Sequence, residues 1–273
     1  MAMSINTNVA AMTALQNLTK TSMQLGVSEN RISTGLKIAG AKDNAAYYAI
    51  AQTMRAEVAG LSASTDSMNR AKSTVDVALV ALDSIQDIMV EMKNKAVAAS
   101  DAGLDEENRA SLVRDFNSLF LQARDIADSA GFNGTNLLAA APDSLSAILN
   151  GDASKTLAVA GSSALTAMKF SKTLVPGTAN ADAADMQTQI GLVEDSIQAF
   201  AAIQSTFGNA SRRLDTQLSF NVKLSDATEA GIGNLVDADI ARESAKLQAL
   251  QIKQQLGLQA LSIANSRPQA ILA

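Results

Sequence analysis

The chain has 273 residues and a net charge of −5, and 47% of its residues are apolar although only 3% are aromatic. It contains neither histidine nor cysteine, which excludes histidine-based acid–base catalysis, cysteine nucleophiles, Ser–His pairs and nearly all zinc sites. Its sequence contains no basic patch, so nothing indicates nucleic-acid binding. We expect no catalytic site, metal site or cofactor. No segment approaches the roughly 18 consecutive apolar residues of a membrane span.

The first 28 residues carry one charged side chain, Lys20, among apolar residues, Ser, Thr, Asn, Gln and Gly. This segment lacks the basic start and continuous apolar core of a Sec signal peptide. Residues 31–46, RISTGLKIAGAKDNAA, interrupt the helix-forming sequence. We expect Gly35 to end the first helix in a left-handed conformation, residues 36–41 to be extended, and Asp43 to cap the next helix.

Two rows of apolar residues then recur every seven positions, which predicts a long coiled-coil helix over residues 54–99. The rows are Met54, Leu61, Met68, Val75, Leu82, Met89 and Ala96, and Ala78, Ile85, Met92 and Ala99. A break at Gly103 precedes Asp105, whose acidic followers suit the start of a second helix. That helix should end at the turn dipeptide Asn133-Gly134.

Residues 137–181 hold two of the three prolines and many Ser, Thr and Gly residues. The segment LSAILNGDASKTLAVAG predicts a β-hairpin that turns at Asn150-Gly151. The heptads resume at 186, so we expect a helix over residues 182–228, an interruption near 230 and a last helix over 237–264. The resumed heptad positions are Met186, Ile190, Val193, Ile197, Phe200, Gln204, Phe207, Ser211, Leu214 and Leu218.

The last helix is apolar on nearly every side of a helical wheel. Leu247, Leu250, Leu258 and Leu261 form one stripe, and Ile252, Leu256 and Ile263 form another. Between them lie Gln248, Gln251, Gln255 and Gln259. Two such terminal helices cannot bury each other fully, so we expect them to order in an assembly, the alternative being a helix hairpin docked on a globular core. The predicted fold is mainly α: an antiparallel long-helix coiled-coil rod with paired terminal helices and a small β-hairpin insert.

Four segments together make the chain similar to bacterial flagellins. They are INTNVAAMTALQNL, RISTGLKIAGAKDNAA, GFNGTNLL, and DADIARESAKLQALQIKQQLGLQAL with PQAIL. The resemblance implies a structural subunit that polymerises into the helical flagellar filament for swimming. It also implies an extracellular location, reached through the flagellar type III export apparatus without a Sec signal peptide. A hook–filament junction protein of the same export class is the alternative, because it shares similar terminal helices.

The resemblance further implies a division of the chain by function. Residues 1–35 and 231–273 would form the inner core, 36–53 a spoke connector, 54–136 and 182–230 the long-helix shell, and 137–181 a small β-containing outer insert. The implied partners are other copies of the chain and related flagellins, the hook–filament junction protein, the filament cap, and a cytoplasmic chaperone on the C-terminal helix at 237–273. Neither nucleic acid nor a membrane span is expected.

Candidate residues follow from these assignments. The expected polymerisation contacts are Ile5, Val9, Met12, Leu15, Leu18, Leu25, Leu247, Leu250, Ile252, Leu256, Leu258, Leu261 and Ile263. The four glutamines Gln248, Gln251, Gln255 and Gln259 are candidates to face the lumen. Spoke contacts are expected at Arg31, Gly35, Lys37, Lys42 and Asp43, although a plain helix–turn–helix corner would use the same residues. Candidates for O-glycosylation are Ser144, Ser154, Ser162, Ser163, Thr166, Ser171 and Thr173.

Overall fold

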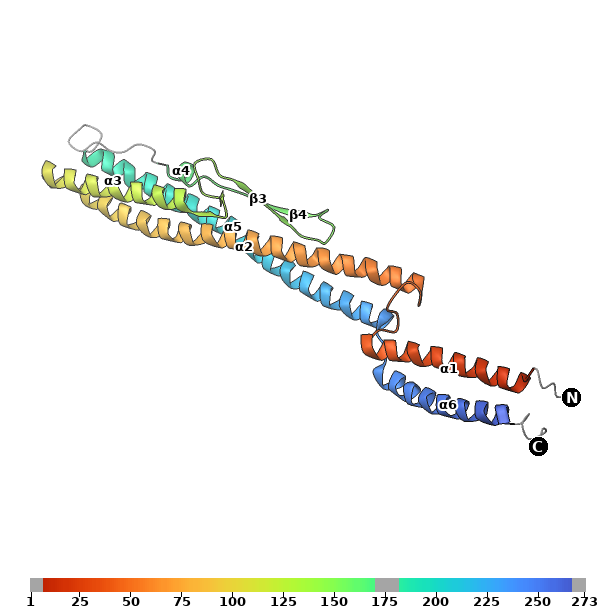
Figure 1. Ribbon diagram of the computed structural model, residues 1–273. Coiled ribbons are helices and arrows are strands. Elements are labelled where there is room, and N and C mark those ends of the chain that lie inside the picture. The colour runs from red at the N-terminus through yellow and green to blue at the C-terminus, as the bar shows by residue number, and fades with distance from the viewer. Residues whose placement is uncertain (1–6, 170–181, 267–273) are drawn as a thin grey trace. The chain divides into compact units, whose positions relative to one another are not determined.

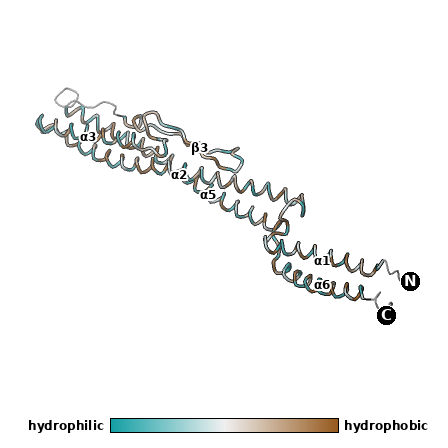
Figure 2. The backbone as a smooth tube through the Cα atoms, viewed as in Figure 1, coloured by the Kyte–Doolittle hydropathy of each residue, from teal (hydrophilic) through white to brown (hydrophobic). Residues whose placement is uncertain are grey.

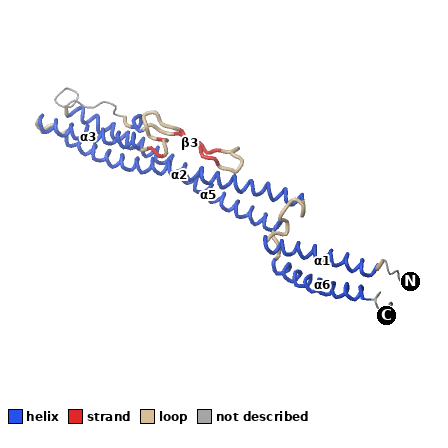
Figure 3. The backbone as a smooth tube through the Cα atoms, in the orientation of Figure 1, coloured by secondary structure: helices blue, strands red, loops and turns tan. Residues whose placement is uncertain are grey.

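The computed structural model describes residues 7–169 and 182–266. Of the described residues, 77% are helical, and the chain divides into two compact units. The central unit comprises Glu57–Ser225, and the terminal unit comprises Met1–Ala56 with Asp226–Ala273. Figure 3 shows that helices make up most of both units and that the strands lie in the central unit. The mainly α fold with a small hairpin is therefore confirmed.

Two long helices, α2 (Ala45–Ala99) and α5 (Ala183–Val236), pass through the central unit and run side by side there (Figure 1). The predicted heptad rows face the core, since every α2 member from Leu61 to Ala99 is at most 3% exposed. On α5 the largest of the heptad residues, Phe200 and Phe207, are fully buried. Burial of these rows confirms the coiled-coil periodicity and removes apolar surface from water, which stabilises this unit.

Polar pairs across the two helices define their alignment. They are Lys72–Asp215, Asp76–Ser211, Asp83–Gln204 and Lys93–Glu194. From one pair to the next, the α5 number falls by the same step as the α2 number rises. The helices are therefore antiparallel with one constant register. The polar heptad positions Gln204 and Ser211 are matched by carboxylates from α2 instead of being left unpaired.

The helix α3 (Glu106–Ser129) begins as the sequence predicts, because the Asp105 carboxylate accepts a hydrogen bond from the Asn108 N–H at 2.7 Å. Its buried face, which includes Phe116 and Ala123, joins the same core. The predicted turn follows in the short hairpin of β1 (Gly131–Phe132) and β2 (Thr135–Asn136). Both turn residues are left-handed, Asn133 at φ 51° and Gly134 at φ 81°, as a type I′ hairpin turn requires.

The predicted second hairpin is formed by β3 (Ser144–Ile148) and β4 (Thr156–Ala160), which pair in antiparallel register from Ser144↔Ala160 to Ile148↔Thr156. A short helix, α4 (Ala164–Ala167), follows it. Isolated hairpins are barely stable. This one is held against both long helices by hydrogen bonds of Ile148, the last residue of β3, and of the next residue, Leu149. The bonds are Ser64 Oγ to Ile148 O at 2.9 Å, Ile148 N to Ser67 Oγ at 3.2 Å, Gln217 Nε2 to Leu149 O at 3.3 Å, and Asn221 Nδ2 to Leu149 O at 3.1 Å.

The tip of this hairpin approaches α2 at a glycine. A Cβ placed on Gly60 would lie 2.3 Å from the carbonyl oxygen of Gly151. The hairpin can therefore pack this closely against α2 only because residue 60 has no side chain.

The terminal unit holds α1 (Val9–Thr34) and α6 (Ile240–Ser266). Gly35 ends α1 at φ 72°, which confirms the predicted left-handed position. Beyond it the two connecting segments join to each other. The N–H of Lys37 donates to Val236 O at 2.7 Å, and the N–H of Ala238 donates to Gly35 O at 2.8 Å.

The long helix predicted over residues 54–99 begins earlier, at Ala45, and two further expectations about helix ends are wrong. Asn44, and not Asp43, caps α2: its side-chain oxygen accepts from the N–H groups of Ala46 and Tyr47 at 3.1 Å. The Asp43 carboxylate instead accepts from two N–H groups of the preceding turn.

The second error is the interruption expected near residue 230. The helix α5 continues through Gly231 and Gly233 and ends at Val236. Burial of Ile232 and Val236, which are 9% and 1% exposed, outweighs the poor helix propensity of the two glycines.

Candidate assembly surface

The helices α1 and α6 pair along a seam of mostly small and polar residues. The seam residues recur at alternating steps of three and four: Ala11, Ala14, Leu18, Thr21, Leu25 and Ser28 on α1, and Leu247, Leu250, Gln254, Gly257, Leu261 and Ala264 on α6. Of these, only Ser28 and Leu250 are fully buried. The pairing therefore hides little apolar surface, and we expect this two-helix hairpin to be weakly stable alone.

Large apolar residues of both helices lie away from the seam, and Figure 2 shows hydrophobic positions along the backbone of each helix. Seven of the predicted polymerisation residues are at least 54% exposed: Val9, Met12, Leu15, Ile252, Leu256, Leu258 and Ile263. Exposed apolar residues at this density mark a surface that is covered in an assembly. The terminal hairpin is thus the candidate assembly surface.

The remaining predicted contacts lie elsewhere. Leu18, Leu25, Leu247, Leu250 and Leu261 point toward the seam within one chain, and Ile5 lies outside the described residues. The wheel placed Leu258 in one stripe with Leu247, Leu250 and Leu261, whereas Leu258 is 54% exposed on the flank of α6. The four lumen candidates, Gln248, Gln251, Gln255 and Gln259, are all exposed.

A helical wheel based on hydrophobicity does not identify two seam residues of α6, Gln254 and Gly257. The Gln254 amide lies 3.5 Å from Ser22 Oγ. An added Cβ on Gly257 would lie 3.3 Å from a methyl carbon of Leu18. Counting steps of three and four from Leu250 would have found both residues.

An ion-pair cluster joins α1 to α6 next to the connecting segments. Arg31 Nη1 lies 2.9 Å from Glu243 Oε1, while Ser28 Oγ donates to Glu243 Oε2 at 3.0 Å. Lys246 Nζ is 3.3 Å from the same Oε2. The hydrogen bond from Arg31, supported by Ser28 and Lys246, holds the pKa of the Glu243 carboxyl below its ordinary value. The sequence singled out Arg31 but gave no signal for its partner.

The other predicted spoke residues surround the connection. Lys37, Lys42 and Asp43 are exposed, and Gly35 is half-buried. Lys37 and Arg31 line a groove of about 440 Å³ together with acidic and basic residues of the segment from Asp237 to Lys246. Lys37 and Lys42 make no ion pair with any described residue. Their charges are therefore available to a neighbouring molecule.

The glycosylation candidates differ in exposure. Ser144, Ser154 and Thr166 are exposed, while Ser162 and Ser163 are half-buried. The Ser163 hydroxyl caps α4 by accepting from the Thr166 N–H. Ser171 and Thr173 lie outside the described residues.

None of the described helices combines the length and the hydropathy that crossing a membrane would require. Residues 5–142 match the family model of the bacterial flagellin N-terminal helical region, and residues 190–273 match that of the C-terminal helical region.

Close relatives support the same assignment. The chain is 44% identical to Flagellin FljK of Caulobacter vibrioides over 99% of this chain and 97% of the relative. It is 36% identical to a flagellin of Brucella melitensis over 99% and 98%. The crystal structure of Bacillus cereus flagellin shares the fold, with a TM-score of 0.50 and 24% identity over 56% of this chain and 86% of that one. The chain therefore belongs to the bacterial flagellin family and is a self-polymerising structural subunit of the extracellular flagellar filament, not an enzyme.

Proposed function

We propose that the terminal hairpin of α1 and α6 is the surface through which the subunits polymerise, with the exposed large apolar residues between Val9 and Leu15 and between Ile252 and Ile263 as its main contacts. The main support for this proposal is the exposure of those large apolar side chains on a hairpin that buries little of its own surface. Covering them in a polymer removes apolar area from water at about 25 cal/mol per Å². Assembly would thereby stabilise helices that are weak in the monomer.

The functional division of the chain follows this surface. Residues 1–35 and 231–273 would form the inner core, 36–53 the spoke, 54–136 and 182–230 the shell, and 137–181 the outer insert. The exposed Gln248, Gln251, Gln255 and Gln259 would face the lumen. Arg31, Gly35, Lys37, Lys42 and Asp43 would form the spoke, with the unpaired charges of Lys37 and Lys42 available to neighbouring subunits.

The same surface supports the proposed partners. An exposed apolar helix needs cover before assembly, so a cytoplasmic chaperone would bind residues 237–273. Export would proceed through the flagellar type III apparatus without a Sec signal peptide. The filament cap and the hook–filament junction protein would meet the two ends of the polymer. If the chain is O-glycosylated, the exposed Ser144, Ser154 and Thr166 are the favoured sites among the described residues.

Electron microscopy of purified protein in a salting-out buffer tests the polymerisation surface. We expect wild-type chains to form long filaments, and chains lacking residues 1–28 or 247–273 to form none. The substitution Leu258→Glu should also prevent filaments, because it would bury a carboxylate without a partner. Leu258→Met, which keeps the volume and the apolar character, is the matched control and should polymerise normally. Normal filaments from Leu258→Glu or from either truncation would refute the proposal.

A further inference from the structure

The charges of the terminal hairpin are divided unequally between its two flanks. On α1, Lys20, Gln24, Val27 and Arg31 follow one another at steps of four, three and four. On α6, Arg242, Lys246, Ala249 and Lys253 do the same. These steps place each set on one side of its helix, so five cations share a single flank of the hairpin.

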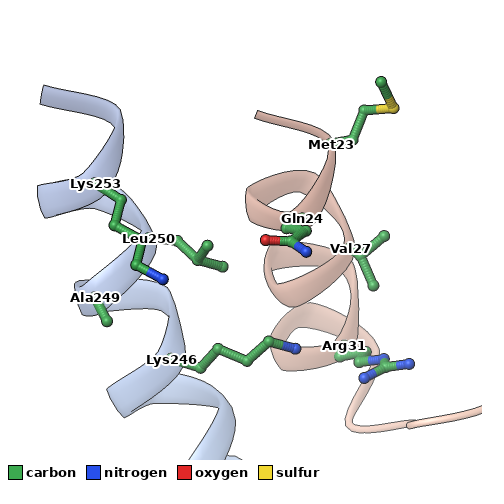
Figure 4. Close-up of a pocket in the computed structure, with 8 residues that line it drawn as sticks. All are labelled: Met23, Gln24, Val27, Arg31, Lys246, Ala249, Leu250 and Lys253. Atoms are coloured by element: carbon green, nitrogen blue, oxygen red, sulfur yellow. The ribbon is translucent and has the colours of Figure 1, made fainter. Parts of the chain in front are cut away.

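This cationic flank contains a groove of about 380 Å³ between the two helices. Figure 4 shows Met23, Val27 and Leu250 in its lining, with Arg31 on one helix and Lys246 and Lys253 on the other. Met23 is 64% exposed and Val27 is 46% exposed. The groove therefore suits an occupant that is apolar and carries negative charge.

The opposite flank carries the complementary charge. Leu15, Ser22, Gly26 and Glu29 lie along one side of α1 at steps of seven, four and three. Glu29 is exposed and makes no ion pair with a described residue. Residues 8–32 and 241–266 contain one other acidic residue, Glu243. Hydrogen bonds from Arg31 and Ser28 hold its carboxylate at the seam.

A glycine on this flank has no explanation within one chain. Gly26 lies inside α1, where glycine is less stable than alanine. A Cβ at this position would meet no atom within 4 Å. Gly191 and Gly208 of α5 are equally open, so the space at Gly26 permits the close approach of a second backbone but does not by itself indicate one.

We propose that the cationic groove of one subunit receives the Glu29 flank of the next, with the Glu29 carboxylate facing Lys253. Lys246 already contacts Glu243, whereas Lys253 has no ion-pair partner among the described residues. The two flanks differ, so the contact is head-to-tail and can repeat without limit, as a filament requires. This inference rests on the proposed polymerisation through the terminal hairpin.

Disulfide mapping tests the contact directly, because the chain has no cysteine of its own. One preparation carries Glu29→Cys and another carries Lys253→Cys; the two are mixed, polymerised and oxidised. We expect a disulfide-linked dimer on a non-reducing gel from the mixture, and little or none when either variant is polymerised alone. The control mixture pairs Glu29→Cys with Gln251→Cys, which lies on the same flank of the hairpin as Glu29, and should yield few dimers.

A charge exchange provides the second measurement. Lys253→Glu and Glu29→Lys should each raise the critical concentration for polymerisation about tenfold, as expected for loss of a partly buried charge pair. The double variant should recover the wild-type value. Lys155→Glu, the same change at an exposed lysine of the central unit, should have no effect.

The outcomes separate this inference from the proposal on which it rests. Wild-type filaments without the 29–253 disulfide, or a double variant that fails to recover, would overturn the pairing alone. Failure of the truncation tests would instead overturn polymerisation through the hairpin. Normal polymerisation of Lys253→Glu, combined with lost binding to phosphatidylserine vesicles, would reassign the groove to an anionic lipid surface and overturn the pairing.

Discussion

Replacing Gly60 with alanine tests whether the hairpin of β3 and β4 is seated on α2 by a glycine. The new Cβ would lie 2.3 Å from Gly151 O and 2.9 Å from Gly151 C. Both atoms belong to the backbone, so rotation of a side chain cannot relieve the overlap. The hairpin tip has to move away from the helix.

The size of the effect follows from the bonds that anchor this tip. Lifting it weakens the four hydrogen bonds that Ile148 and Leu149 make with α2 and α5, each with a net value of about 1 kcal/mol. The alanine returns about 1 kcal/mol through its better helix propensity. We therefore expect Gly60→Ala to lower the free energy of unfolding by about 2–3 kcal/mol, within the range measured for overpacked sites.

Urea unfolding of the monomer, followed by circular dichroism below the critical concentration, measures this change. Gly208→Ala is the matched control: Gly208 also lies inside a long helix, and a Cβ there would meet no atom within 4 Å. It should raise the free energy of unfolding by about 1 kcal/mol. If Gly60→Ala stabilised the protein as Gly208→Ala does, the close seating of the hairpin would be refuted.

Two further predictions concern the terminal unit. The pKa of Glu243 is lower in the folded chain than its ordinary value of 4.5. Its contribution to the stability of the terminal hairpin is therefore fully present above pH 4.5 and is lost as the pH falls through the folded pKa. Amide exchange should show this acid-induced loosening of α1 against α6 in the wild type, and Glu243→Gln should remove the pH dependence without removing the helices. Replacing the α2 cap, Asn44→Ala, should cost about 1 kcal/mol by urea unfolding, and equal stability of this variant and the wild type would contradict the capping role.

The long helices could be predicted from the sequence because their heptad positions hold large apolar residues. Met68, Val75 and Leu82 leave no doubt about which face is buried. The β-hairpin was predictable for a related reason, since turn-forming residues separate two apolar runs. The turn itself centres on Gly151 and Asp152, where Asn150 O accepts from the Ala153 N–H, and not on Asn150-Gly151. In both cases a short-range pattern and the tertiary structure agree.

The terminal hairpin was predicted less well because its seam breaks the link between hydrophobicity and burial. Ser28 is fully buried while Leu258 is 54% exposed, so hydropathy alone does not indicate which residues of the two helices face each other. The residues that decide which side faces the partner helix are Gly257 and Ser28, whose small size allows close approach. The end of α5 failed for a similar reason, since burial of Val236 outweighed two unfavourable glycines.

The hydrogen bonds between the two connecting segments have a consequence for the order of folding. They join Gly35 and Lys37 to Val236 and Ala238. If these bonds formed before any other contact, they would close a loop of about 200 residues. Once α2 and α5 have paired in the central unit, the remaining loop is about 35 residues, and closure costs about 1.5 kcal/mol less. The central coiled coil should therefore fold first, and the hydrogen bonds between the connecting segments should form in a later step of folding.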